Sequence, residues 1–150
     1  MKFVFDDGGR SAAGRKGYTG DCVCRAIAIA AQIDYMTVYD YLAEQNASQR
    51  QSSRSKGKRQ RSASGGICTN RKWFKDYMLH LGFAWTPTMS IGSGCRVHLR
   101  PDELPSGRLI CQVSKHLVAV IDGVIRDTHD PSRNGKRCVY GFWQQECLSS

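Results

Sequence analysis

The stretch KHLVAVIDGVIRDTHD, residues 115–130, decides the fold that this sequence predicts. Its central dipeptide, Asp122-Gly123, is strongly preferred in two-residue β-hairpin turns because both positions tolerate a positive φ. The flanking runs, 116–121 and 124–128, are rich in the β-branched residues that favour strands. The stretch therefore predicts an antiparallel hairpin.

The hairpin register places an imidazole beside a carboxylate. If Ile121 pairs with Val124, alternation of side chains puts His116 and Asp127 on the same face as diagonal neighbours, roughly 7–8 Å apart at the backbone. Side chains at that separation reach each other, so the carboxylate can orient the imidazole. Asp130 falls on the opposite face in this register.

Two alternatives stay open within this stretch. His129 shares the face of His116 and competes with it for the role of a base. A bulge near Thr128 would reverse the parity of the following residues and bring Asp130 onto the face in place of Asp127. We favour His116, because the first position of a strand leaves its ring at the sheet edge, where a helix terminus can meet it.

Upstream of the hairpin, the run CVCRAIAIAAQI, residues 22–33, is apolar nearly all round after its first turn. This pattern predicts a helix buried in the centre of the domain. Thr19 and Asp21 precede the run and offer side chains that could cap the helix.

Two further helices and several strands complete the expected fold. An amphipathic helix is predicted from about residue 37 to 46, and a second over residues 71–81, capped by Thr69 or Asn70 and ending at Gly82. Helices followed by strands predict a single α+β domain over residues 1–150, with an antiparallel sheet packed against the buried helix. The predicted strands cover residues 97–99, 108–113, 116–121, 124–128 and 138–143.

Cys22 is the candidate nucleophile. It opens the buried helix, where backbone N–H groups lack intrahelical partners and the dipole is positive, so the thiolate is stabilised. Cys24 lies about 200° further round the helix and cannot face the same cleft. We therefore interpret Cys24 as a small buried residue of the core.

The cysteine count bears on the cellular compartment. The chain has seven cysteines, an odd number, and its first residues contain too short an apolar run for a secretory signal. Nor does any apolar run approach the roughly 20 residues that span a bilayer. We expect reduced thiols and a cytoplasmic protein.

A basic segment over residues 48–66 separates the two halves of the chain. It has six Lys and Arg residues, no acidic residue and no large apolar one, and it contributes most of the formal net charge of +9. We expect a solvated insertion that could bind nucleic acid or an acidic protein. Its charged residues are Arg50, Arg54, Lys56, Lys58, Arg59 and Arg61.

Taken together, a cysteine at a helix start, a later histidine and an aspartate across a hairpin resemble the papain-like cysteine peptidase superfamily. Three stretches carry the resemblance: GDCVCRAIAIA, KDYMLHLGFAW and SKHLVAVIDGVIRDTHDPS. The arrangement is similar to that of small bacterial and phage proteins with a bacteriocin-leader-peptidase-like domain. The resemblance covers most of the chain outside the basic segment.

The resemblance implies a cysteine hydrolase that acts on a peptide, isopeptide or related amide bond of a peptide or protein substrate, without a cofactor. Cys22, His116 and Asp127 would form its catalytic triad. Papain-like enzymes usually carry a glutamine shortly before the nucleophile as an oxyanion donor, and residues 14–19 contain none. The backbone N–H of Cys22 could serve as one oxyanion donor instead, with Thr19 or Tyr18 as the other.

The sequence leaves two alternatives to a hydrolase open. The fold could have lost catalysis and act as a binding protein for a polyanion or partner through the basic segment. A zinc site is the other chemical alternative, with Cys22 and Cys24 as one half and Cys95 and His98 as the other. No pair of C-x2-C knuckles supports it.

Overall fold

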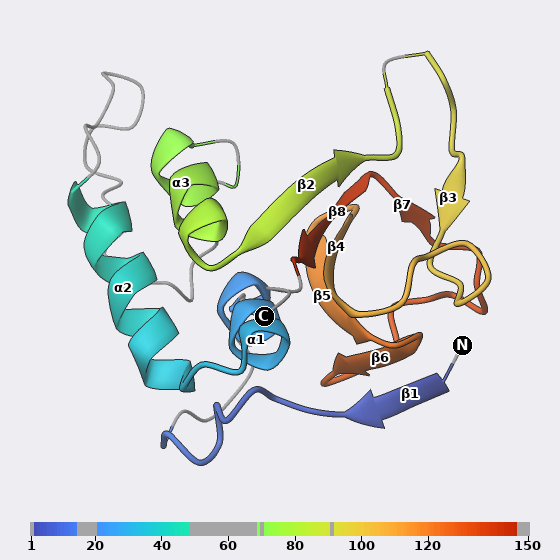
Figure 1. Ribbon diagram of the computed structural model, residues 1–150. Coiled ribbons are helices and arrows are strands. Elements are labelled where there is room, and N and C mark those ends of the chain that lie inside the picture. Colours follow the sequence, from blue (N-terminus) through green and yellow to red (C-terminus); the bar gives the residue numbers. More distant parts are fainter. Residues whose placement is uncertain (1, 15–20, 49–68, 70, 91, 147–150) are drawn as a thin grey trace.

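The computed structural model describes residues 2–14, 21–48, 69, 71–90 and 92–146. These residues form an α+β fold in which three helices lie to one side of a sheet (Figure 1). The elements are β1 (Lys2–Phe5), α1 (Cys22–Ala31), α2 (Tyr35–Ser48), α3 (Lys72–His80), β2 (Phe83–Pro87), β3 (Val97–His98), β4 (Arg108–Val113), β5 (His116–Ile121), β6 (Val124–Asp127), β7 (Cys138–Val139) and β8 (Gly141–Gln145).

The main sheet has six strands in the order β1-β6-β5-β4-β8-β2, and β3 pairs with β7 separately. Neighbours from β6 to β2 are antiparallel, as the sequence predicts. The expectation of a wholly antiparallel sheet is wrong at one edge, because β1 runs parallel to β6. The sheet is therefore mixed. Neither β1 nor β2 was predicted as a strand.

The predicted hairpin register is confirmed. Ile121 pairs with Val124, and Ala119 pairs with Arg126. Asp122 and Gly123 have φ values of 49° and 79°, as a two-residue turn with both central residues in the left-handed region requires.

The core has two parts, one on each face of the sheet. Alternate residues of β5, Leu117 and Ala119, pack with the three helices, whereas Val118 and Val120 pack with residues of β4 and β6 on the other face. Helix α1 is buried from Val23 to Ala30 and lies between α2 and the sheet (Figure 1), which confirms the predicted central helix. Among the described residues, no helix has the length and apolarity needed to cross a membrane.

The position of α1 is fixed at its C-terminus by a residue of the sheet. Arg108, at the start of β4, donates hydrogen bonds to the carbonyl oxygens of Ile29, at 2.7 Å, and Ala30, at 2.5 Å. These carbonyls have no intrahelical partner, and a guanidinium also suits the negative end of the dipole. Arg108 pairs with the last residue of β5, so α1 runs alongside β5 and begins near His116.

The predicted helix caps are wrong where the structure describes them. Asp21 is the N-cap residue of α1 but makes no side-chain capping bond, since its carboxylate is engaged elsewhere. Helix α3 begins after Arg71, again without a side-chain cap, rather than after Thr69 or Asn70. Its buried face, with Phe74 and Tyr77, is in the core as its spacing predicts.

A disulfide joins Cys95 to Cys138, with the two Cα atoms 5.8 Å apart. The expectation that all thiols are reduced is therefore wrong for this pair. The two cysteines come from segments that pair only in the folded chain: β3 pairs with β7, which places His98 opposite Cys138, and Cys95 lies three residues before His98. Cys22, Cys24 and Cys111 are free thiols.

Candidate active site

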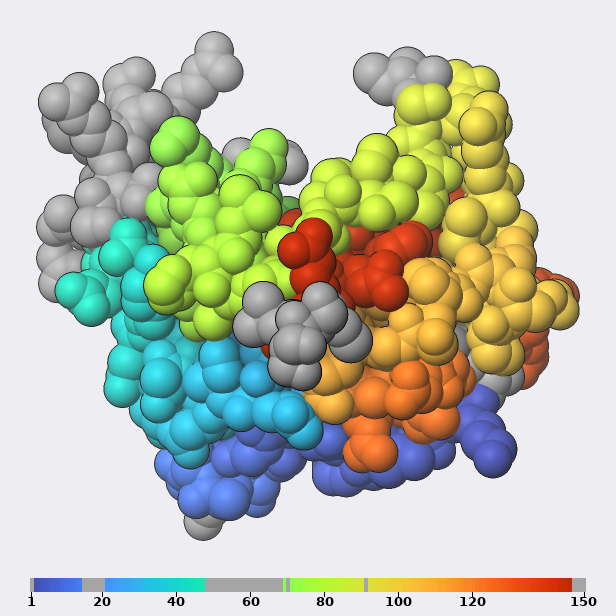
Figure 2. Space-filling view, in the orientation of Figure 1, coloured from blue at the N-terminus to red at the C-terminus, as the bar shows by residue number. Residues whose placement is uncertain are grey.

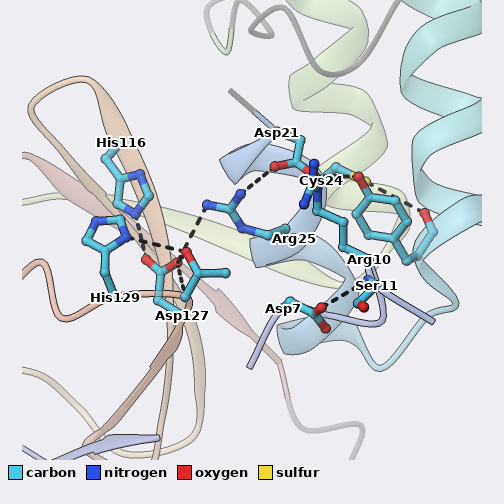
Figure 3. Close-up of polar contacts among 11 residues, drawn as sticks. Asp7, Arg10, Ser11, Asp21, Cys24, Arg25, His116, Asp127 and His129 are labelled. Atoms are coloured by element: carbon cyan, nitrogen blue, oxygen red, sulfur yellow. Dashed lines mark hydrogen bonds and ion pairs between the residues drawn. The ribbon is translucent and has the colours of Figure 1, made fainter. Parts of the chain in front are cut away.

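Three elements bring the predicted triad together. Cys22 is the first residue of α1, His116 the first of β5 and Asp127 the last of β6. The Nε2 atom of His116 lies 2.6 Å from Oδ2 of Asp127 (Figure 3). The Cys22 side chain lies close enough to the imidazole of His116 and to the backbone N–H of Leu117 to interact with both. Since Nε2 faces the carboxylate, Nδ1 is the ring nitrogen left for the sulfur.

The surroundings of Cys22 favour its thiolate. Burial alone would raise the pKa of this half-buried thiol, but the hydrogen bonds from His116 and Leu117 and the positive charges of His116 and Arg25 outweigh that effect. The pKa of Cys22 is therefore lowered from its ordinary value. By contrast, burial without such partners raises the pKa of Cys111 to about 12.

The same contacts favour the protonated form of His116. Burial would lower the pKa of this imidazole, yet hydrogen bonds and charge interactions with Asp127 and Cys22 raise it to about 9. The lowered pKa of Cys22 and the raised pKa of His116 both favour a thiolate–imidazolium pair, in which the thiolate is the nucleophilic form.

Asp127 is held ionised by several donors. Burial opposes ionisation, but the bonds from His116 and from the backbone N–H of Thr128, at 2.7 Å, keep its pKa below the ordinary value, and the charge of Arg25 adds to this. The Arg25 Nη2 atom lies 3.6 Å from the second carboxylate oxygen, Oδ1. The carboxylate is thus fixed in orientation by groups from three parts of the chain.

A buried ionic network continues from the triad into the core (Figure 3). Arg25 lies between Asp127 and Asp21 and pairs with both carboxylates. Asp21, which is 0% exposed, also accepts a hydrogen bond from the hydroxyl of Tyr35 and lies 3.1 Å from Nε of Arg10. Burial and this bond raise the pKa of Tyr35, so the phenol stays protonated and acts as a donor.

This network was not predicted from the sequence, although part of it had a signal. Asp21 and Arg25 have the i, i+4 spacing of helical ion pairs, and Arg25 interrupts an otherwise apolar buried run. Arg10 and Tyr35 come from other parts of the chain, and only the fold brings them to Asp21.

The structure distinguishes His116 from His129 as the base, and Asp127 from Asp130 as the carboxylate that orients the base. His129 lies beyond the end of β6 and is exposed, with its ring centroid 5.2 Å from that of His116. Asp130 accepts a hydrogen bond from the backbone N–H of Ser132 at 2.9 Å and so closes a turn. The residue that hydrogen-bonds His116 is Asp127.

The structure also bears on metal binding. Cys95 cannot supply a thiolate because it is disulfide-bonded, and His98 pairs with Glu103 at 3.2 Å, so the predicted zinc half-site there is wrong. Cys24 is buried, and its sulfur lies 3.6 Å from the carbonyl oxygen of Tyr35. Cys22 and Cys24 therefore do not form the other half of a zinc site.

In the part of the chain that the structure describes, one other group of side chains could hold a cation. The possible ligand atoms of His116, Asp127 and His129 all lie within 4.8 Å of one another. A metal bound there would compete for the atoms that join His116 to Asp127.

Two predictions fall outside the described residues. These are the second oxyanion donor, Thr19, and the basic segment with Arg50, Arg54, Lys56, Lys58, Arg59 and Arg61.

Comparisons with known proteins leave the family open. No family model, no curated protein and no solved structure gave a significant match to this chain. The resemblance to papain-like peptidases therefore stays a prediction, and the account of function depends on the geometry of Cys22, His116 and Asp127.

Proposed function

We propose that the chain is a papain-like cysteine hydrolase that cleaves a peptide, isopeptide or related amide bond. The observation that carries the proposal is the arrangement of three side chains at a helix start: Cys22 interacts with His116, and His116 hydrogen-bonds with Asp127. A nucleophile, a base in contact with it and a group that orients the base are the requirements for covalent catalysis by a thiol.

The proposed reaction has two steps. The Cys22 thiolate attacks the amide carbonyl carbon, and His116 gives its proton to the leaving amine as the C–N bond breaks, which leaves a thioester on Cys22. Water then attacks the thioester while His116 accepts one of its protons. The C–S bond breaks, the carboxylic acid leaves, and the thiolate–imidazolium pair is restored.

Asp127 acts by position and charge. Its bond to Nε2 holds the His116 ring with Nδ1 toward the sulfur, and its negative charge stabilises the imidazolium. The backbone N–H of Cys22, at the start of α1, has no intrahelical acceptor and is one donor for the oxyanion of the tetrahedral intermediates.

The proposal predicts that an acyl group accumulates on one cysteine. Incubation with an activated ester such as p-nitrophenyl acetate should release p-nitrophenol and add one acetyl mass to the peptide that contains Cys22. Cys22→Ala should abolish both signals, because the acyl acceptor is gone.

The matched control is Cys111→Ala, which removes a free thiol buried on the other face of the sheet. This variant should keep p-nitrophenol release and acetylation at the wild-type level per folded molecule. Acylation that persists in folded Cys22→Ala protein would refute the assignment of the nucleophile.

A further inference from the structure

Three side chains converge at the open end of the hairpin. The possible ligand atoms of His116, Asp127 and His129 all lie within 4.8 Å of one another, and Figure 3 shows the two imidazole rings beside the carboxylate. The hairpin register accounts for this arrangement, because its extension beyond the pair Ala119 and Arg126 places His116 opposite His129. The proposed triad uses two of these side chains and gives His129 no role.

The geometry of the three side chains fits a zinc ion. Zinc binds histidine nitrogen at about 2.0–2.1 Å in a tetrahedral arrangement, so two imidazoles on one ion have ring centroids about 5 Å apart. The centroids of His116 and His129 are 5.2 Å apart. Two nitrogen ligands also match zinc better than calcium or magnesium, which take oxygen ligands. His129 is exposed, so an ion can enter from solvent and keep water as its fourth ligand.

Asp127 presents one carboxylate oxygen to such an ion. Its Oδ1 atom accepts a hydrogen bond from the backbone N–H of Thr128 at 2.7 Å and lies 3.6 Å from Nη2 of Arg25. Oδ2 faces Nε2 of His116. The charge of Arg25 opposes a cation, but Arg25 also pairs with Asp21, which offsets that charge. Outer partners on one oxygen orient a carboxylate so that the other can bind a metal.

We propose that His116, Asp127 and His129 form a zinc-binding site, and that bound zinc and catalysis by His116 exclude each other. The second part rests on the proposed function. Zinc takes the place of the proton between Nε2 of His116 and Oδ2 of Asp127, and that proton passes to water. Ligand atoms of a tetrahedral zinc ion lie about 3.3 Å apart, so these two atoms, now 2.6 Å apart, must separate by about 0.7 Å.

A zinc ion on Nε2 disables His116 as an acid–base group. The ring then keeps a single proton, on Nδ1, the nitrogen that faces Cys22. Transfer of this proton to a leaving amine would convert the ring to a zinc-bound imidazolate, whereas the metal-free imidazolium becomes a neutral ring. Zinc also takes Oδ2 of Asp127 away from the imidazole. The site therefore makes hydrolysis by Cys22 sensitive to zinc.

Titration calorimetry of Cys22→Ala protein with zinc chloride tests the site without the thiol. We expect one tightly bound zinc ion per chain. Adding His129→Ala should weaken binding at least about tenfold, since even the loss of an outer partner costs about 10–100-fold in metal affinity. Absence of zinc binding to folded Cys22→Ala protein, or equal affinity with and without His129, would overturn the proposal.

His80→Ala in the same Cys22→Ala background is the matched control. His80 is an exposed histidine at the end of α3. In the space-filling view, the green α3 lies apart from the orange hairpin (Figure 2). This substitution should leave the zinc affinity unchanged. Equal losses for His80→Ala and His129→Ala would mean that zinc binds exposed histidines in general, and would overturn the proposal.

Inhibition of wild-type protein tests whether zinc and catalysis exclude each other. Zinc chloride should slow acetylation of Cys22 by p-nitrophenyl acetate, and EDTA should restore it. His129→Ala should need at least about tenfold more zinc for the same relative inhibition. Equal inhibition of the two proteins would show that zinc acts through the thiol and would overturn the exclusion. Zinc binding without any acylation of Cys22 would refute the hydrolase and leave the zinc site standing.

Discussion

Asp127→Asn is expected to lower the rate of substrate hydrolysis about 10²-fold or more. Correctly positioned acid–base groups contribute about 10²–10⁴-fold, and the substitution removes the charge that holds His116 protonated and pairs with Arg25. Because Asp127 raises the pKa of His116, its loss should also move the alkaline limb of the pH–rate profile from about pH 9 toward the ordinary imidazole value. Steady-state rates between pH 5 and 10 measure both effects.

Asp130→Asn is the matched control for this variant. Asp130 holds the backbone N–H of Ser132 through a carboxylate oxygen, and an asparagine oxygen can accept the same bond. We expect a rate within about twofold of wild type and an unchanged alkaline limb. Equal losses in the two variants, or a larger loss for Asp130→Asn, would mean that Asp127 does not orient the base.

Asp21→Asn should have the largest effect on stability. Its carboxylate is fully buried and opposes two guanidinium groups, Arg10 and Arg25, while accepting the hydroxyl of Tyr35. Removing one partner of a buried ion pair costs about 3–5 kcal/mol, and this substitution takes one negative charge away from both guanidinium groups. Chemical denaturation of the purified variant gives the change in the free energy of unfolding.

Asp76→Asn provides the comparison at the surface. Asp76 pairs with Lys72 at 3.0 Å across one turn of α3, but its side chain is 57% exposed. Such pairs contribute about 0–1 kcal/mol. A loss for Asp21→Asn no greater than that for Asp76→Asn would show that the network around Arg25 is not a structural core.

Local sequence patterns were sufficient for the elements that hold the triad. The Asp122-Gly123 turn and the alternation on either side of it specify a register, and that register alone brings His116 to Asp127. The apolar run after Asp21 forms a helix that is buried from Val23 to Ala30, as the sequence predicts. In both cases the determining contacts are close in sequence.

Features that depend on distant segments could not be predicted in this way. Strand β1 is four residues long and exposed, and its parallel pairing with β6 joins opposite ends of the chain. The disulfide joins Cys95 to Cys138, which are 43 residues apart in the sequence and lie beside the paired strands β3 and β7. The sequence predicts that Asp21 caps helix α1, whereas in the structure its carboxylate binds Arg10 and Tyr35. These two residues come close to Asp21 only in the folded chain.

The central claim is that His116 activates Cys22, and the rate of Cys22 alkylation by iodoacetamide at pH 6.5 tests it most directly. Mass-spectrometric mapping should find Cys22 labelled before Cys24 and Cys111, the other free thiols among the described residues, because both of these are buried. Cys95 and Cys138 should stay unlabelled because they are disulfide-bonded. His116→Ala should slow the reaction of Cys22 about tenfold or more, since an unassisted thiol, with a pKa of about 8.5, is only about 1% ionised at this pH. Labelling of Cys24 before Cys22, or an unchanged Cys22 rate in folded His116→Ala protein, would contradict the account.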